Sequence, residues 1–253
     1  MKGVVLAGGL GSRLLPMTRV TNKHLLPVFD RPMIYFPIQQ LVHAGIDDIL
    51  IVTGGNHAGD FLRLLGNGKE FGLRRLNYAY QEGEGGIAEA LGLAEDFGDG
   101  NPICVILGDN IFETPIREAV DTYRADPEGA MVLLKEVDEP ERFGVATLQE
   151  ERVVSIVEKP SESEGNLAVT GCYFYDGRVF EIVHGLSPSG RGELEITDVN
   201  NRYVEWGALR HHVVSGWWTV PGPSSRCITR RSWSRPPRMR PCNDEGLASR
   251  TAR

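Results

Sequence analysis

The sequence lacks the long apolar run and the cysteine spacing that mark membrane proteins and secreted, disulfide-bonded proteins. Its 253 residues contain no stretch of eighteen apolar residues, so we expect no association with a membrane. The start, Met1-Lys2-Gly3-Val4, leads directly into an expected strand rather than a signal peptide. The four cysteines show no CxxC spacing and no histidine ligand pattern nearby, which is typical of thiols in a reducing compartment. We therefore expect a cytoplasmic protein.

A basic excess is also missing. The formal net charge is −7, which argues against nonspecific binding to nucleic acid. Hydrophobic residues make up 41% and charged residues 24% of the chain, which are ordinary values for a globular protein. This length suits one large α/β domain or two small ones.

Two common phosphate-binding motifs are absent. The dinucleotide fingerprint G-x-G-x-x-G fails, because Leu14 stands where its third glycine is needed. The P-loop G-x-x-x-x-G-K-[ST] fails as well, because Gly68-Lys69 is followed by Glu70. A dinucleotide-binding or P-loop protein is therefore not indicated.

A different glycine-rich loop is present at the start of the chain. The expected strand at residues 4–6 runs into Ala7-Gly8-Gly9-Leu10-Gly11-Ser12-Arg13. Glycines allow backbone N–H groups to approach an anion closely, and successive N–H groups form an anion-binding concavity. Arg13 and Lys23 would add positive charge around the same anion. The loop predicts a site for a nucleoside triphosphate, and a plain tight turn is the alternative.

Short apolar strands alternate with helical patterns through the first half. We expect strands at residues 4–6, 49–53, 76–80, 103–107 and 130–134, and helices at 33–43, 59–65, 87–95 and 116–124. This alternation predicts a mainly parallel sheet covered by helices on both faces, with ligands at the carboxyl ends of its strands. Asp109 follows one strand there, as the glycine loop follows another. From about Glu141 the strands at 145–148, 153–158 and 169–175 follow closely, which suggests a second layer that holds a sugar.

Further motifs appear in a fixed order along the chain. They are Leu6 to Arg13 with Pro16, Thr18, Lys23 and Leu25-Leu26-Pro27-Val28, then Pro32-Met33-Ile34-Tyr35, Ala44-Gly45-Ile46, Gln81, Leu107-Gly108-Asp109-Asn110, Glu141-Arg142-Phe143-Gly144-Val145, Glu158-Lys159-Pro160, Ala168-Val169-Thr170-Gly171 and residues 191–200. In these motifs the chain resembles the sugar-1-phosphate nucleotidyltransferases, most closely their thymidylyltransferase branch.

The resemblance covers about residues 1–219 and implies an α/β fold. That fold is a Rossmann-like, mainly parallel mixed sheet flanked by helices, of the nucleotide-diphospho-sugar transferase type. Residues 1–135 would bind the nucleotide and residues 136–219 the sugar phosphate. The implied reaction transfers the thymidylyl group of dTTP to α-D-glucose 1-phosphate, with Mg²⁺, giving dTDP-glucose and pyrophosphate for deoxysugar biosynthesis. Use of UTP is an alternative, and the family suggests a homo-oligomer, specifically a tetramer.

The resemblance also implies the roles of individual residues. Arg13, Lys23 and Asp109 would be catalytic, and Asp109 would bind Mg²⁺, although an aspartate after a strand also suits a turn or a helix cap. The other positions fall into two groups, nucleotide-binding (Leu6, Gly8, Gly9, Gly11, Ser12, Arg13, Gln81 and Gly86) and sugar-phosphate-binding (Gly144, Glu158, Lys159 and Val169). Gln81 would read the imide edge of thymine or uracil by donating and accepting at once. Residues 83–86 could equally form a plain flexible turn.

The resemblance ends after Thr219. Family members would continue with Asp-x-Gly, where the aspartate is a second metal carboxylate, but this chain has Val220-Pro221-Gly222. Residues 220–253 carry eight arginines, no lysine and only Asp244 and Glu245 as acids, and we expect this basic tail to be disordered.

Two interpretations of the tail are a basic binding arm and, as we prefer, a coding frame read out of register after the Thr219 codon. In either case Mg²⁺ would depend on Asp109 and the triphosphate, and oligomer formation could be disrupted. A nucleotide-binding protein with impaired catalysis is therefore a further alternative.

Overall fold

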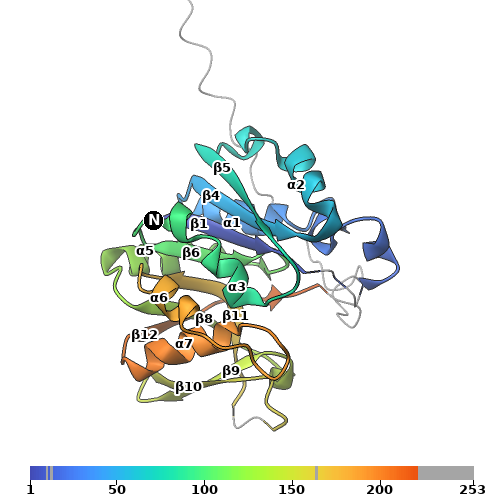
Figure 1. Ribbon diagram of the computed structural model, residues 1–253. Coiled ribbons are helices and arrows are strands. Elements are labelled where there is room, and N and C mark those ends of the chain that lie inside the picture. The colour runs from blue at the N-terminus through green and yellow to red at the C-terminus, as the bar shows by residue number, and fades with distance from the viewer. Residues whose placement is uncertain (10, 12–13, 163–164, 222–253) are drawn as a thin grey trace, which may run out of the picture.

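A mixed nine-stranded sheet forms the centre of the computed structural model, which describes residues 1–9, 11, 14–162 and 165–221 (Figure 1). The strands of this sheet are β1 (Lys2–Ala7), β4 (Asp48–Gly54), β5 (Arg75–Gln81), β6 (Ile103–Leu107), β8 (Ala130–Glu136), β9 (Gly144–Gln149), β10 (Arg152–Glu158), β11 (Leu167–Tyr175) and β12 (Leu209–Val213). The helices are α1 (Tyr35–His43), α2 (Ala58–Leu65), α3 (Ile87–Gly92), α4 (Glu95–Gly98), α5 (Arg117–Ala125), α6 (Val179–His184) and α7 (Ile196–Glu205). None of the helices in the described part of the chain is long and apolar enough to span a bilayer.

The sheet changes character along its width. Its main path runs β10-β9-β11-β6-β1-β4-β5, and β8 pairs with β11 and β12. The pairs β1–β4, β1–β6 and β4–β5 are parallel, whereas β11 pairs antiparallel with β6, β8 and β9. The expected Rossmann-like mixed sheet is confirmed.

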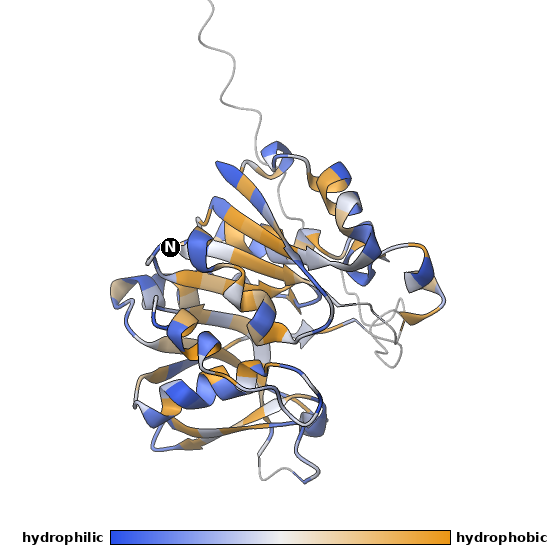
Figure 2. Ribbon diagram, in the orientation of Figure 1, coloured by the Kyte–Doolittle hydropathy of each residue, from blue (hydrophilic) through white to orange (hydrophobic). Residues whose placement is uncertain are grey.

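The central strands send alternate side chains into two hydrophobic cores, one on each face of the sheet. On β1, Val4 and Leu6 enter the core covered by α3, α6 and α7, whereas Val5 and Ala7 enter the core beneath α1, α2 and α5. Figure 2 shows the resulting pattern, with apolar strands inside and polar helix surfaces outside. Burial on both faces explains why these strands read as continuous apolar runs in the sequence.

The expected elements of the first half are present, with one difference: the helix expected at 87–95 is divided into α3 and α4. The second layer expected after Glu141 is wrong, because β9, β10 and β11 extend the same sheet. β11 pairs antiparallel with β6 within the sheet, so it does not form a second layer over it. His211 and His212 belong to β12.

One edge of the sheet collects most of the predicted site. The carboxyl ends of the parallel strands β1, β5 and β6 lie there. The glycine loop follows β1, the loop at residues 82–86 follows β5, and Asp109 follows β6. Because β11 runs antiparallel to β6, its first residues lie at the same edge. The pair Gly144–Glu158, where β9 begins and β10 ends, continues this edge toward the sugar-phosphate side.

Short elements join the strands and helices. They are the 3₁₀ turns η2 (Met17–Arg19), η3 (Lys23–Leu25), η4 (Gly55–His57), η5 (Lys69–Phe71) and η6 (Pro140–Arg142), and two small ladders, β2 (Pro27–Val28) with β3 (Arg31–Pro32) and β7 (Ile111–Phe112) with β13 (Trp218–Thr219). The last ladder returns the end of the described chain to the segment that follows Asp109.

Candidate active site

The glycine loop begins where β1 ends. Gly9 has φ +91° and Gly11 has φ +62°, values that L side chains rarely adopt, so the turn needs glycine at both positions. A Cβ on Gly11 would lie 2.9 Å from Thr18, whose hydroxyl donates to the Gly11 carbonyl. The described residues leave a cleft of about 330 Å³ beside Gly9. Predicted ligands Ser12 and Arg13 lie outside the described residues, so the structure describes only the two ends of this loop.

Lys23 and Asp109 meet at the centre of the edge. Lys23 Nζ lies 2.8 Å from Asp109 Oδ2, and their side chains are 26% and 13% exposed. Burial favours the neutral acid, but the charge of Lys23 and the hydrogen bonds from Lys23 and Asn110 outweigh it and hold the pKa of Asp109 below its usual value. The structure thus brings together two of the predicted catalytic residues, with the carboxyl ionised.

The turn η3 determines where Lys23 points. The Asn22 side chain accepts from the His24 backbone N–H at 2.9 Å and from the His24 ring nitrogen Nδ1 at 2.8 Å. The His24 ring packs against Gly108, where a Cβ would lie 2.8 Å from the ring. Burial, followed by the charge of Lys23, lowers the pKa of His24 to about 3. The His24 imidazole is therefore neutral and packs beside the Lys23–Asp109 ion pair.

Asn110 connects Asp109 to two distant segments. Its amide donates to Asp109 Oδ1 at 3.0 Å, and its oxygen accepts from the Gly171 N–H at 2.9 Å and from Trp218 Nε1 at 2.7 Å. The Gly171 position has no room for a Cβ, which would lie 2.5 Å from the Asn110 amide. Asn110 was not among the predicted site residues, although it occurs in one of the motifs, because its side chain bonds to partners 61 and 108 residues away in the chain.

Val220 follows the β7–β13 ladder toward Asp109. Trp218 pairs with Phe112 and Thr219 with Ile111, so the next residue continues toward Asn110. Valine has no oxygen in its side chain and cannot bind a cation there. Among the described residues, no three His, Cys, Asp or Glu side chains gather as a metal site. Beside Lys23, the Asp109 carboxylate therefore fits Mg²⁺ only when substrate phosphates supply most of the other ligands.

Gln81 lies at the carboxyl end of β5 and is 5% exposed. Its amide nitrogen donates to the Gly86 carbonyl at 3.1 Å and to Glu89 Oε2 at 2.6 Å. The expectation that this amide both donates to and accepts from a base is therefore not matched, because both N–H groups already have partners. Gly86 has φ +99° and no room for a Cβ, which would lie 2.5 Å from the Leu194 carbonyl oxygen.

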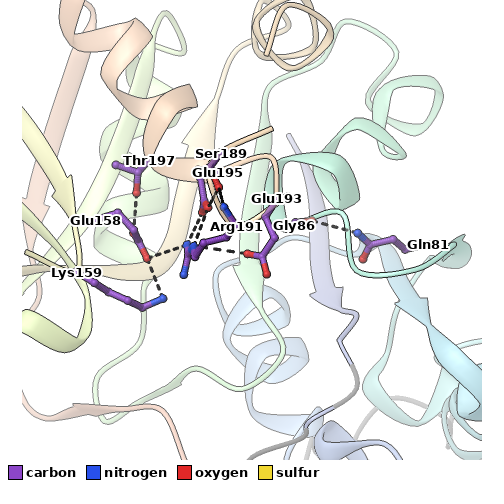
Figure 3. Close-up of polar contacts among 9 residues, drawn as sticks. All are labelled: Gln81, Gly86, Glu158, Lys159, Ser189, Arg191, Glu193, Glu195 and Thr197. Atoms are coloured by element: carbon purple, nitrogen blue, oxygen red, sulfur yellow. Dashed lines mark hydrogen bonds and ion pairs between the residues drawn. The ribbon is translucent and has the colours of Figure 1, made fainter. Parts of the chain in front are cut away.

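The predicted sugar-phosphate residues lie beyond this loop (Figure 3). Glu158 Oε1 lies 3.1 Å from Lys159 Nζ, and Glu158 Oε2 accepts from Thr197 at 2.8 Å. A Cβ on Gly144 would lie 3.4 Å from the same carboxylate, so glycine keeps this space open. Val169 is buried in the core, as is the Leu6 side chain, so only the backbone of these two residues is available to a ligand.

Arg191 lies among the predicted sugar-phosphate residues, although it was not itself one of them. Its guanidinium lies 2.7 Å from Glu195 and 3.8 Å from Glu158, in the group drawn in Figure 3. The hydrogen bond with Glu195 raises the pKa of Arg191. Arg191 and Lys159 together place two cations beside one carboxylate, which suits a phosphate next to sugar hydroxyls. Arg191 is the first residue of the motif at residues 191–200, so the sequence did contain a signal for a positive charge at this place.

The nucleotide and sugar sides are joined by backbone hydrogen bonds. The Leu194 N–H donates to the Gly85 carbonyl at 2.8 Å, and the Ala88 N–H donates to the Leu194 carbonyl at 3.1 Å. Arg191 and Gln81 are therefore held on two segments that bond directly to each other. The predicted nucleotide and sugar-phosphate residues are therefore linked through the fold.

Residues 2–222 match the nucleotidyl transferase family. The chain belongs to this family. It is 47% identical over 211 residues to a glucose-1-phosphate thymidylyltransferase of Neisseria meningitidis, covering 83% of this chain and 73% of the relative. A relative of the same name from Xanthomonas campestris is 46% identical, covering 82% and 71%.

Solved structures agree with this family membership. A Bacillus anthracis structure named as a glucose-1-phosphate thymidylyltransferase, in complex with sucrose, has a TM-score of 0.83 and 53% identity and covers 87% of this chain and 89% of its own. A UDP-glucose pyrophosphorylase bound to UDP-glucose has a TM-score of 0.74 and 25% identity, with 86% and 91% covered. The recognition of the family from the ordered motifs is confirmed.

Proposed function

We propose that this nucleotidyltransferase transfers the thymidylyl group of dTTP to α-D-glucose 1-phosphate. A phosphate oxygen of the sugar attacks the α-phosphorus of dTTP, the bond to the bridging oxygen of the β-phosphate breaks, and pyrophosphate leaves. The products are dTDP-glucose and pyrophosphate. The name shared by the relatives at 46–48% identity supports this choice of substrates.

The observation that carries the proposal is the arrangement of three groups along one sheet edge. The glycine loop and Gln81 lie on one side, the Lys23–Asp109 pair lies at the centre, and Arg191 with Glu158 and Lys159 lies on the other side. Such a transfer depends on positioning and charge neutralisation more than on a protein nucleophile. Residues 1–135 would hold the nucleotide and residues 136–219 the sugar phosphate.

Each side chain then has a task that its surroundings allow. Lys23 would bring an ammonium group to the reacting phosphates, and Lys159 and Arg191 would hold the sugar phosphate. Glu158 would accept hydrogen bonds from sugar hydroxyls, since Thr197 and Lys159 already fix its orientation. Arg13 would stabilise the leaving pyrophosphate, a role predicted from the sequence alone.

Mg²⁺ is the cofactor that we propose for this site. Asp109 would hold it together with substrate phosphates, and when bound it would neutralise charge on those phosphates. Lys23 shares the Asp109 carboxylate, so the ammonium and the cation would both neutralise the same anionic region. A homo-oligomeric state and a cytoplasmic location stay predictions from the sequence.

Two measurements test the function. Pyrophosphate release is followed with glucose 1-phosphate and either dTTP or UTP, and we expect dTTP to be preferred. A preference for UTP would assign the chain to uridylyl transfer instead.

Val220 supports a second candidate, a nucleotide-binding protein with impaired catalysis, because it removes a carboxylate from the metal side. Calorimetric binding of dTTP without turnover at any Mg²⁺ concentration would favour that candidate and contradict the enzymatic function.

A further inference from the structure

The Gln81 amide lies between two acceptors. Its nitrogen donates to the Gly86 carbonyl at 3.1 Å and to the Glu89 carboxylate at 2.6 Å. A carbonyl and a carboxylate cannot donate, so the amide must turn its nitrogen toward them and its oxygen away. The short contact to a charged acceptor is the stronger of the two hydrogen bonds.

The oxygen of the same amide faces the glycine loop. A Cβ built on Gly8 would lie 2.5 Å from Gln81 Oε1, so this oxygen occupies the space that a side chain on Gly8 would take. Within the described residues, no group donates to Oε1. The face of Gln81 that is open to the nucleotide side is therefore an acceptor.

Glu89 is held firmly enough to impose this orientation. It lies in the first turn of α3, where a carboxylate is favoured by the helix dipole. Its carboxylate packs against Gly85, where a Cβ would lie 2.2 Å from the carboxylate carbon. Gly85 is fixed in turn by the hydrogen bond from Leu194. The acceptor that orients Gln81 therefore has little freedom to move.

We infer that Glu89 is a positioning residue that determines base specificity by fixing the Gln81 amide with its oxygen toward the base. The inference rests on the proposed function, in that the site takes a pyrimidine nucleoside triphosphate at this loop. Thymine and uracil carry an N3–H donor that the fixed oxygen can accept. Cytosine presents an unprotonated N3 at the same place, and two acceptors repel each other. The Glu89–Gln81 pair therefore selects against cytosine and leaves thymine and uracil to be distinguished elsewhere.

The experiment compares dTTP with dCTP. The wild-type chain and the variants E89L and E89Q are assayed for kcat/KM with each nucleotide at saturating glucose 1-phosphate. In E89L the Gln81 amide loses its stronger acceptor and can turn its nitrogen toward the base. We expect kcat/KM for dTTP to fall about tenfold and the ratio of dTTP to dCTP to narrow by at least that factor. E89Q keeps a carbonyl acceptor and should retain a ratio close to that of the wild type.

A matched control separates specificity from helix stability. Glu118 occupies the first turn of α5 and is exposed, so E118Q removes a comparable carboxylate far from Gln81 and should leave the ratio unchanged. If E89L lowers kcat/KM equally for dTTP and dCTP, or leaves both as in the wild type, the inference is wrong.

Binding calorimetry distinguishes a failure of the proposed role of Glu89 from a failure of the proposed function. If the wild-type chain turns over no dTTP, the proposed function fails. A binding preference for dTTP over dCTP that is lost in E89L would still support the role of Glu89. Normal turnover with an unchanged preference in E89L would contradict the role of Glu89 alone.

Discussion

Lys23 and His24 are neighbours in the chain, but Lys23 forms an ion pair whereas His24 is buried and neutral. The Lys23 ammonium emerges at the site and pairs with Asp109 at 2.8 Å, whereas the His24 ring is buried beneath it in neutral form. Both residues lie in the turn η3, which is capped by Asn22 and directs the two side chains into different surroundings. The positive charge of the site is therefore supported by a residue that must remain uncharged.

Burial of His24 makes the stability of the protein depend on pH. The pKa of His24 is about 3 when folded and 6.5 by its ordinary value, so between these values the unfolded chain binds more protons. Stability should therefore fall as the pH decreases from about 6.5 toward 3, with His24 contributing about 2 kcal/mol of this loss at pH 5. Urea unfolding at pH 7.5 and pH 5 should show a smaller loss in H24Q than in the wild type.

The exposed His184 provides the control for this comparison. H184Q should keep the pH dependence of the wild type, because that side chain is not buried. Equal pH dependence of H24Q and the wild type would show that His24 is not the group responsible.

If the proposed function holds, the residue at position 220 should affect how strongly nucleotide binding depends on Mg²⁺. Its place after the β7–β13 ladder brings residue 220 toward Asp109, so V220D would add a second carboxylate to the metal side. We expect V220D to lower the Mg²⁺ concentration needed for half-maximal dTTP binding by about tenfold, the effect of about 1.4 kcal/mol. V220A is the matched control, since it removes the valine without adding oxygen. Identical Mg²⁺ titrations of V220D and V220A by calorimetry would contradict this placement.

At the scale of elements, the loop between β5 and α3 is built around contact with the segment before α7. Gly86 faces the Leu194 backbone so closely that no side chain fits, and Gly85 and Ala88 bond to the same residue. The segment that carries Arg191 thus fixes the loop that follows Gln81. Neither element would hold its functional side chain in place alone.

Alanine substitutions at two glycines of this loop distinguish the effect of backbone strain from that of a steric clash with Leu194. Gly83 and Gly86 both have positive φ, +75° and +99°, but only a Cβ on Gly86 would strike backbone, at 2.5 Å from the Leu194 oxygen. G83A should cost about 1–2 kcal/mol of unfolding free energy through backbone strain and leave dTTP affinity intact. G86A should cost more and weaken dTTP binding at least tenfold. Denaturant unfolding and calorimetry measure the two effects, and equal losses in both variants would contradict the contact with Leu194.

At the scale of the whole molecule, the two functional halves share one sheet and both cores. β11 pairs with β6 on one side and with β8 and β9 on the other, and each core contains residues from both halves. Neither half can separate without exposing apolar surface of the other.

This sharing predicts cooperative unfolding. Differential scanning calorimetry should show one transition, with equal calorimetric and van't Hoff enthalpies, because the loss of β11 would open both cores at once. Near-ultraviolet circular dichroism and intrinsic fluorescence should report the same midpoint. Two resolved transitions, divided near residue 135, would show that the halves unfold independently.

The sequence by itself determined the family and the strand-and-helix alternation, and it predicted most of the residues that the candidate site contains. These features depend on local signals: a glycine loop after an apolar strand, an aspartate after another, and motifs in a fixed order. The expected second layer failed because strand pairing is not local, and a close succession of strands does not reveal whether they extend a sheet or cover it. Asn110, Arg191 and Glu89 escaped notice for a related reason, since each acts through partners brought near by folding.

Tertiary structure alone decided how the side chains of the candidate site are oriented. The residue Gln81 was readable from its motif, but the direction of its amide depends on the acceptors Gly86 and Glu89. In the same way, the sequence has valine at position 220, while the register of the β7–β13 ladder directs this position toward Asn110, the neighbour of Asp109. A linear sequence specifies which groups are available, whereas their orientation is fixed by hydrogen-bond partners and packing that exist only in the folded chain.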